Sequence, residues 1–369
     1  MKIAMLGDIA LFGRYCKNKN SNIEQQLKVV REYLSGHDVI VGNLETPFAD
    51  KEKPAGSKSA HVKSHPSNIE LLKYLGVTHV TLANNHIGDF GVEAYKQTIR
   101  LLDEAGISWF GTEGMQIRIE SDGEKIALLG YCSYNTNPSR IWLNSHQALN
   151  LLEVDEVVEA MRESTESGYL PILAVHSGQE HVHTPSSHDV AFARGLAEQF
   201  DYIYYGHHPH VVQGAELVRN SPIFYSLGNF IFDDVYTPRD LSKPLITLSE
   251  ANKTGIIASV EIKEGNIINW MCVPTYLAEK EMLVGDQVFD FNMSPYSNAL
   301  KKAGSKDYDV ERTNKINEYI DSRRNMRNFK WYIKRLNFNS LGIMFAARRN
   351  AKNYRIKFVN QLSRLGAKQ

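Results

Sequence analysis

The feature that most constrains this fold is an alternation of short apolar, β-branched segments with longer segments of helical hydrophobic spacing. The predicted strands are residues 3–6, 38–41, 78–82, 125–131, 172–175, 202–205 and 223–227. The predicted helices are residues 21–34, 67–74, 92–105, 153–167 and 187–200. Strands that alternate with helices are typical of α/β domains with a largely parallel sheet. A predicted hairpin, residues 255–263 and 267–274, indicates a second, strand-rich part packed on the first.

Polar residues end six of the predicted strands, and three of these six ends carry histidine. The strand ends are Gly7-Asp8, Gly42-Asn43-Leu44-Glu45, Asn84-Asn85-His86, His176-Ser177-Gly178, Gly206-His207-His208 and Gly228-Asn229. Any one of them fits an ordinary turn, because Gly, Asn and Asp are common turn residues. In α/β folds, however, ligand sites lie beyond the carboxyl ends of the strands. The series therefore predicts one site that is assembled from distant parts of the chain.

The densest part of the series is the histidine stretch that follows the aromatic strand 202–205. It contains three histidines within four residues, His207, His208 and His210. Pro209 restricts the backbone between the last two. Imidazole is the commonest side-chain ligand for zinc, copper, iron and nickel. A histidine-rich polar loop without a metal is the alternative, and the other strand ends argue against it.

Oxygen ligands together with imidazoles suit Mn, Fe, Zn or Mg, so we expect a divalent metal, as one ion or as two. The predicted ligands are Asp8, Glu45, Asn85, His176, His208 and His210. Two such ions activate a water for attack on a phosphoester. His86, which follows Asn85, is the predicted general acid that protonates the leaving oxygen.

Three further residues are predicted to contact substrate, each beside an alternative. Glu180 binds substrate or positions His176 from behind. Asn229 contacts substrate or holds a turn beneath the site, and Arg14 is placed to meet an anionic group. His181 and His183 are expected in a loop or at the surface.

The motif series in this order resembles that of the CapA (poly-γ-glutamate capsule biosynthesis) family, which is similar to the calcineurin-like metallophosphoesterases. The resemblance covers roughly residues 1–280. It implies a four-layer sandwich, with two mixed β-sheets between layers of helices and metal at the strand ends. By the same resemblance, Asn85 is the asparagine ligand, His176 and the His208/His210 pair are imidazole ligands, and His86 is the acid. Glu45 replaces a bridging aspartate, and His207 competes with His208 for the first place in the pair.

The sequence departs from the phosphoesterase pattern after the first strand. The usual Asp-x-His is Asp8-Ile9-Ala10 here, so one imidazole ligand is missing. This leaves two functional readings. One is a metal-dependent hydrolase of a phosphoester or of a polymer such as polyglutamate or exopolysaccharide. The other is a non-catalytic metal-binding scaffold of capsule or exopolysaccharide biosynthesis.

The last quarter of the chain has a different composition from the rest. Residues 300–369 hold 18 Lys and Arg against 5 Asp and Glu, a surplus of 13 positive charges in a chain that is neutral as a whole. We expect residues 1–296 to form the α/β domain and residues 297–369 a basic, mostly helical extension. The extension packs on the acidic body, or binds an anionic polymer or membrane surface. We expect no nucleic-acid partner.

Cysteine content and hydropathy indicate the compartment. Cys16, Cys132 and Cys272 are far apart, which argues against a disulfide framework or a thiolate zinc site. No apolar run approaches the roughly 20 residues that span a bilayer. We therefore expect a cytoplasmic protein, with membrane association through the basic tail as an additional possibility.

Overall fold

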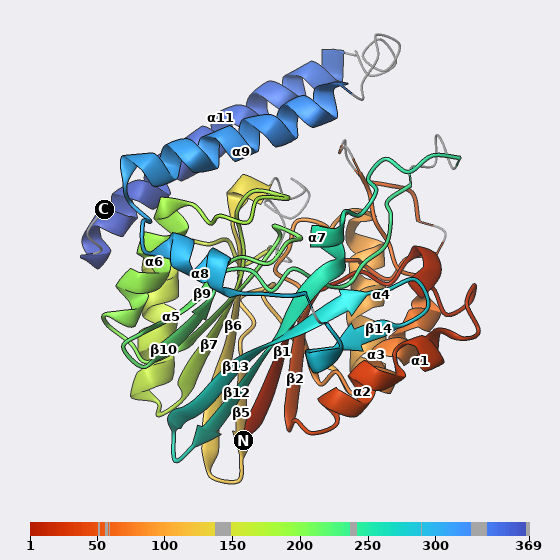
Figure 1. The fold of residues 1–369 in the computed structure, drawn as a ribbon, viewed down its shortest axis with the longest axis horizontal. Coiled ribbons are helices and arrows are strands. Elements are labelled where there is room, and N and C mark those ends of the chain that lie inside the picture. The colour runs from red at the N-terminus through yellow and green to blue at the C-terminus, as the bar shows by residue number, and fades with distance from the viewer. Residues whose placement is uncertain are drawn as a thin grey trace.

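The protein is described by a computed structural model for residues 1–50, 52–55, 58, 60–136, 149–236, 242–288, 290–325 and 338–366. Two mixed sheets lie between layers of helices (Figure 1). This arrangement confirms the predicted α/β sandwich of two mixed sheets flanked by helices.

The first sheet has the strand order β14-β13-β12-β1-β2-β3-β4, and β11 pairs with β1. Strands β1 to β4 run parallel, whereas β12, β13 and β14 are antiparallel to their neighbours. Their bounds are β1 Lys2–Ile9, β2 Val39–Leu44, β3 His79–Thr81, β4 Ser108–Phe110, β11 Asn229–Ile231, β12 Thr254–Lys263, β13 Asn266–Leu277 and β14 Met282–Val284.

The second sheet has the strand order β5-β6-β7-β8-β10-β9. Strands β6, β7, β8 and β10 are parallel, and the hairpin partners β5 and β9 are antiparallel. Their bounds are β5 Ile117–Ser121, β6 Glu124–Cys132, β7 Leu170–His176, β8 Ile203–His207, β9 Ala215–Val218 and β10 Ser221–Phe224.

Helices cover the outer faces of the two sheets. The α-helices are α1 Ile23–Gln26, α2 Lys28–Leu34, α3 Ile69–Leu75, α4 Gly91–Glu104, α5 Val154–Glu166, α6 Ser187–Ala197, α7 Glu250–Lys253, α8 Ser294–Leu300, α9 Lys306–Asn325 and α11 Phe338–Leu362. The 3-10 turns are η1 Gly13–Tyr15, η2 Pro66–Asn68, η3 Tyr134–Thr136, η5 Gly285–Gln287 and η6 Ser363–Leu365.

Three hydrophobic clusters account for the layered arrangement. One lies between the sheets and includes Met5, Val41 and Tyr205. A second joins the outer face of the first sheet to α2, α3 and α4, and the third joins the second sheet to α5 and α6. Phe358 and Leu362 of α11 belong to the third cluster, so the second half of α11 is packed on the body.

The first strand is longer than the sequence pattern indicated. It was expected to end at Leu6, but β1 continues through Gly7 and Asp8 to Ile9. The extra residues stay in the sheet because β2 and β11 flank them, with Asp8 opposite Asn43 and Asn229. Asp8 is therefore fixed on both sides by strand pairing rather than by a turn.

Glycines at strand ends permit close backbone approaches. A Cβ atom on Gly206 would lie 2.0 Å from the Tyr225 carbonyl oxygen, and one on Gly7 would lie 2.1 Å from that of Gly228. Neither backbone can move without disturbing the paired strands around it. Glycine is therefore required here for space, in addition to any role in turning the chain.

We expect Gly206→Ala to lower the free energy of unfolding by about 2 to 3 kcal/mol, because the added methyl overlaps a buried carbonyl. Urea unfolding followed by circular dichroism measures this. Gly265→Ala is not a fair comparison because Gly265 has a positive φ. Gly36, whose φ is ordinary and whose Cβ would lie 3.7 Å from its nearest neighbour, provides the matched control. Equal stability of Gly206→Ala and the wild type would contradict this account.

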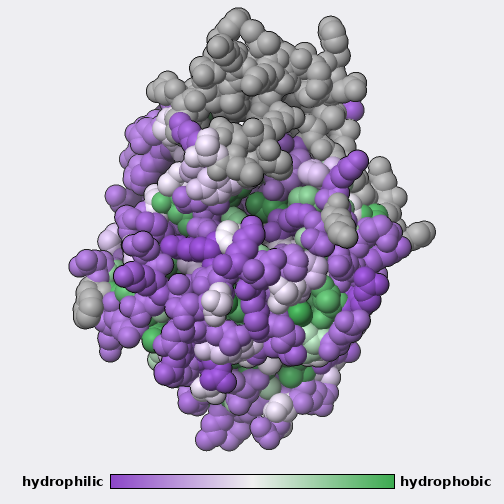
Figure 2. Space-filling view, turned by 90° about the vertical axis from the view of Figure 1, so that its right-hand side faces the viewer, coloured by the Kyte–Doolittle hydropathy of each residue, from purple (hydrophilic) through white to green (hydrophobic). Residues whose placement is uncertain are grey.

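The described helices include none that is long and apolar enough to cross a membrane. The face in Figure 2 is largely hydrophilic, with small separate hydrophobic patches. Helices α9 and α11 lie above the edge of the sheets at which the parallel strands end (Figure 1). The predicted division of the chain at residue 296 stays a prediction.

Candidate metal centre

The predicted ligands meet where strands of both sheets end. Asp8 and Glu45 come from the ends of β1 and β2, and His176 ends β7. His208 and His210 follow β8, and Asn85 lies in the loop after β3. All six are buried. The chain thus brings together the whole predicted set in one polar cluster inside the protein.

Glu45, His208 and His210 form the centre of this cluster. Each offers one ligand atom, and these atoms lie within 4.8 Å of one another. Glu45 Oε1 is 3.5 Å from His210 Nε2. Both carboxylate oxygens of Glu45, and Nδ1 of His208, are buried without a hydrogen-bond partner among the described residues. Unpartnered buried carboxylates are costly, and a cation between these atoms would satisfy them. The donors therefore fit a divalent metal ion.

The ring of His210 is held in place by the nitrogen that points away from Glu45. Nδ1 of His210 lies 2.9 Å from Asn229 Oδ1 and 3.2 Å from Asp8 Oδ2. The usual arrangement of a metal-binding histidine has one ring nitrogen on the ion and the other N–H on an oxygen acceptor. Asn229 and Asp8 supply that acceptor.

His176 and Asn85 extend the cluster on the other side of Glu45. His176 Nε2 is 3.0 Å from Asn85 Oδ1 and 3.9 Å from Glu45 Oε1. The Asn85 amide also donates to the Thr136 carbonyl at 3.0 Å, which fixes its oxygen toward His176. These two residues and Glu45 are placed to hold a second ion, or to support the first.

His207 and His208 have different surroundings. His208 belongs to the group with Glu45 and His210, whereas His207 Nδ1 lies 3.6 Å from Asp8 Oδ1. Both ring nitrogens of His207 are buried without a hydrogen-bond partner among the described residues. The geometry thus favours His208 as the first member of the pair, the question that spacing left open.

The protonation states reflect many ionisable groups in a dry space. Burial, joined by the nearby charge of Asp8, raises the pKa of Glu45 well above its usual value. Burial lowers the pKa of His208 to about 4. Burial also opposes charge on His210, but Glu45 and Asp8 outweigh it and raise its pKa to about 10. Carboxylates and imidazoles crowded into one dry space favour a cation among them, and a divalent metal ion would supply that charge.

The backbone of the histidine stretch is strained. His208 has φ +95° and His210 has φ +55°, on either side of Pro209. Non-glycine residues in such conformations cost on the order of 1–3 kcal/mol each and persist where the surrounding structure holds them. Here the amide N–H of His208 donates to Asp8 Oδ2 at 3.3 Å, and the carbonyl of His210 accepts from Asn252 at 2.9 Å. In this backbone conformation, both imidazole rings face the cluster.

His86 is oriented by a neighbouring carboxylate. Its Nδ1 lies 2.6 Å from Asp89 Oδ2, and Asp89 also accepts from Lys58 Nζ at 2.8 Å and from the Val62 amide at 3.0 Å. Burial raises the pKa of Asp89, but His86 and Lys58 outweigh it and lower the pKa to about 2. An ionised Asp89 holds the proton of His86 on Nδ1, which leaves Nε2 for contact with a substrate.

The predicted substrate residues lie in different surroundings. Glu180 is half-buried, and the positive charges of His208, His210, His181 and His86 overcome burial to lower its pKa to about 2. Arg14 forms an ion pair with Asp233 at 3.5 Å, on the side of α7. Asn229 is fully buried, and its amide nitrogen donates to the Asn252 carbonyl. Contact of these three with a substrate stays a prediction.

Three residues that support the site were not singled out from the sequence. Asn43 donates to Asp8 Oδ1 at 2.8 Å and lies 3.3 Å from His176 Nδ1, so it joins the two sheets. Lys58 and Asn252 come from segments without a motif. Of the three, Asn43 alone carried a signal, since it stands within the strand-end series.

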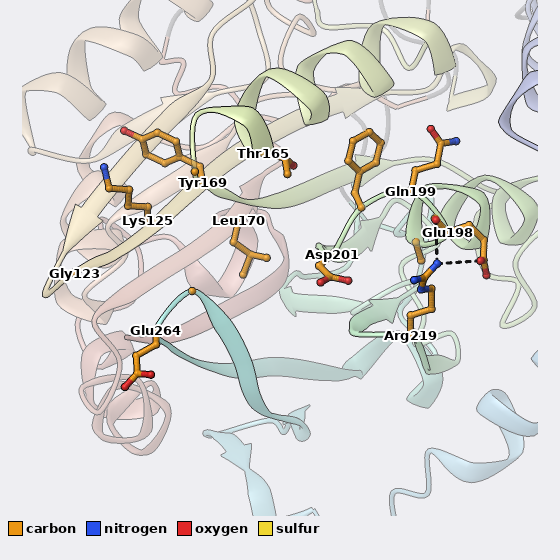
Figure 3. A pocket seen from close by; sticks show the side chains of 14 residues that line it. Gly123, Lys125, Thr165, Tyr169, Leu170, Glu198, Gln199, Asp201, Arg219 and Glu264 are labelled. Carbon is orange, nitrogen blue, oxygen red and sulfur yellow. Dashed lines mark hydrogen bonds and ion pairs between the residues drawn. The ribbon is translucent and has the colours of Figure 1, made fainter.

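A hollow of about 670 Å³ lies elsewhere on the protein, where β7 begins and the β5–β6 and β12–β13 turns lie (Figure 3). Arg219, Glu198 and Asp201 are among its lining residues. Arg219 is paired there with Glu198 (Figure 3), and the strand-end histidines are absent from its lining. The side chains that could bind a metal ion at the strand ends therefore lie in the buried cluster and not in this hollow.

Fold and site together define an α/β protein with a buried carboxylate–imidazole centre fit for a divalent metal. Residues 2–234, more than half of the chain, match the family described as "Bacterial capsule synthesis protein PGA_cap". The chain belongs to this family.

Relatives with curated names agree with that assignment. The chain is 26% identical over 287 residues to the "Capsule biosynthesis protein CapA" of Bacillus anthracis, covering 72% of this chain and 68% of the relative. It is 26% identical over 247 residues to the "PGA biosynthesis protein CapA" of Bacillus subtilis, covering 64% of each. The match to the second relative is thus under two thirds of its length.

A putative 5′-nucleotidase from Staphylococcus aureus is among the similar solved structures. It is 12% identical with a TM-score of 0.47, and the match covers 82% of this chain and 58% of that one. The NAD nucleotidase of Haemophilus influenzae is 14% identical with a TM-score of 0.41, covering 88% and 60%.

Proposed function

We propose that this protein is a metal-dependent hydrolase that acts on a phosphoester or on the linkages of a capsule-type polymer. The observation that carries the proposal is the buried group of Glu45, His208 and His210, whose ligand atoms face one another with Glu45 otherwise unpartnered. A divalent ion held there would supply a Lewis acid and a more acidic bound water.

The protein's own residues would bind, orient and protonate. Asp8 and Asn229 keep His210 in one orientation, and Asn85 does the same for His176. His86 would give the leaving group a proton from Nε2 as the imidazolium, with its Nδ1 proton held by Asp89 and its Nε2 proton taken up from water beforehand. Glu180 faces the same histidines and would orient the substrate or a water.

The names of relatives support a polymer as the biological substrate. Besides the two CapA proteins, the chain is 28% identical over 217 residues to a "Probable polyglutamine synthesis accessory protein" of Mycobacterium tuberculosis. We therefore extend the proposal to a role in the synthesis of a capsule-type polymer, with the basic tail contacting an anionic polymer or a membrane surface.

A second candidate function is a metal-binding scaffold without turnover. The specific observation in its favour is Ala10, which is fully buried at the position where a metal-ligating imidazole was expected. A weakened centre would hold metal and partners yet hydrolyse slowly.

Hydrolysis of bis(p-nitrophenyl) phosphate by Mn²⁺-loaded protein separates the two candidates. We expect measurable turnover that falls by about 100-fold or more in His208→Ala, because a ligand of the ion is lost. His188→Ala, at the start of α6 and outside the cluster, is the matched control and should keep full activity. Metal binding without any turnover in the wild type would favour the scaffold, and equal turnover in His208→Ala would refute the site.

A further inference from the structure

Helix α9 lies outside the family match, and it contacts the loop that carries Glu180 and His181. The match ends at residue 234, and α9 spans Lys306–Asn325. Residues on one face of α9 meet this loop in order. Tyr308 OH donates to the Pro185 carbonyl at 2.9 Å, and Arg312 Nε donates to the Thr184 carbonyl at 3.0 Å.

The same face of α9 also contacts His181, a histidine beside the metal centre. The ring of Tyr319 contacts that of His181, with centroids 4.8 Å apart and the ring planes tilted by 38°. Tyr308, Arg312 and Tyr319 are spaced at helical intervals, and each is more buried than its neighbours. Figure 1 shows α9 above the strand ends, which is the side of the protein that holds the cluster.

His181 connects this face to the cluster itself. Its amide donates to the Pro209 carbonyl at 2.7 Å, and its ring lies 6.2 Å from that of His210. The Asn252 amide bonds both His181 Nδ1 and the His210 carbonyl, each at 2.9 Å. Backbone strain is present here as well, because His181 has φ +61°. His181 lies in a loop, as expected, and this loop is held between α9 and the centre.

The charge of the tail indicates which kind of ligand would bind beside this face of α9. Helix α9 itself carries five Lys and Arg against five Asp and Glu, so the positive surplus of the tail lies beyond α9, for example in α11, which has five Lys and Arg and no Asp or Glu. The phenol and imidazole of Tyr319 and His181 are flat surfaces on which amide planes can rest. A polymer that carries many carboxylates would contact the rings of Tyr319 and His181 near the metal centre. Farther along, it would meet the positive charges of the tail.

We propose that Tyr319 and His181 form a ledge that binds the units of an anionic chain next to its reacting group, which makes Tyr319 a specificity-determining residue. The proposal rests on the proposed function for what happens at the centre, but the ledge is a binding subsite in its own right. The extension is then part of the substrate site instead of a separate domain.

Binding of a fluorescent γ-linked glutamate oligomer to the full-length, Mn²⁺-loaded protein tests the ledge by anisotropy. We expect Tyr319→Ala to weaken oligomer binding by about fivefold to tenfold, the effect of losing one aromatic contact. Tyr319→Phe should retain most of the affinity because the ring remains. Ile320→Ala, on the exposed side of α9, is the matched control and should bind as the wild type does.

Two other readouts distinguish a failure of the ledge from a failure of the hydrolase. Mn²⁺ affinity and turnover of bis(p-nitrophenyl) phosphate are measured on the wild type and on Ile320→Ala, and we expect these two proteins to be equal in both. The wild type could bind the oligomer in a manner that depends on Tyr319 and yet hydrolyse no ester. That result would support the ledge and contradict the proposed hydrolase activity.

The ledge is overturned by any of three results. These are a wild type that does not bind the oligomer, equal binding by Tyr319→Ala and wild type, and preferential binding to phosphatidylserine vesicles over the oligomer. The last result would assign the basic extension to a membrane surface.

Discussion

Glu45→Gln is expected to lower the affinity for Mn²⁺ by about 100-fold or more. Loss of a residue that merely orients a ligand typically costs about 10- to 100-fold, and Glu45 supplies the ligand atom itself. The glutamine keeps the shape of the side chain but removes the negative charge that faces His210 at 3.5 Å. Isothermal titration with MnCl₂ measures the change.

Stability of the metal-free protein separates lost affinity from misfolding. Glu45 forms a buried ion pair with His210, so its neutral amide removes one of the charges that raise the pKa of His210. We therefore expect metal-free Glu45→Gln to remain folded but to unfold at a lower temperature than the wild type. The exposed Glu279 provides the matched control, Glu279→Gln, which should bind Mn²⁺ normally. Unchanged affinity in Glu45→Gln would remove Glu45 from the site.

His86→Ala is expected to lower the rate of ester hydrolysis by about 100-fold or more, in the range typical of a lost general acid. The metal affinity should stay as it is, because His86 faces Asp89 and is not among the residues of the central group. The loss should be greater for an alkyl phosphodiester than for the p-nitrophenyl ester, since a poorer leaving group needs the proton more.

The dependence on leaving group distinguishes a proton donor from a structural residue. A residue that only shaped the site would slow both esters by the same factor. His188→Ala again provides a control outside the cluster. Equal losses for both esters in His86→Ala would contradict the assigned role, and full activity would exclude it.

The layered fold followed from the sequence because hydrophobic periodicity is a local property. Long strands such as β6 and β13, and helices such as α4, have enough residues for their pattern to be visible. Strands β4, β11 and β14 have three residues each and were not predicted. Their pairing is decided by neighbouring strands, so no local pattern could reveal it.

The candidate site was predictable to the extent that its residues stand at strand ends. Asp8, Glu45 and His176 meet because their strands share one edge of the sandwich. Lys58 comes from an irregular loop, and its ammonium donates both to Asp89 and to the Asn85 carbonyl. Its role depends on a tertiary contact between segments 31 residues apart, and nothing in its local sequence marks it.

The basic tail shows the same limit of sequence reasoning. Its composition indicated an appendage, and its charge indicated an anionic partner. The contacts of Tyr308 and Arg312 with the loop at Thr184 and Pro185 depend on how α9 crosses the strand ends. The sequence carries no local mark of that crossing.

Anomalous diffraction from crystals soaked in MnCl₂ tests the central claim most directly. The account predicts a peak bounded by the Glu45 carboxylate and the imidazoles of His208 and His210, at roughly 2.0–2.3 Å from each ligand atom. A protein with no peak among these three residues, and with Glu45 hydrogen-bonded to other side chains instead, would contradict it.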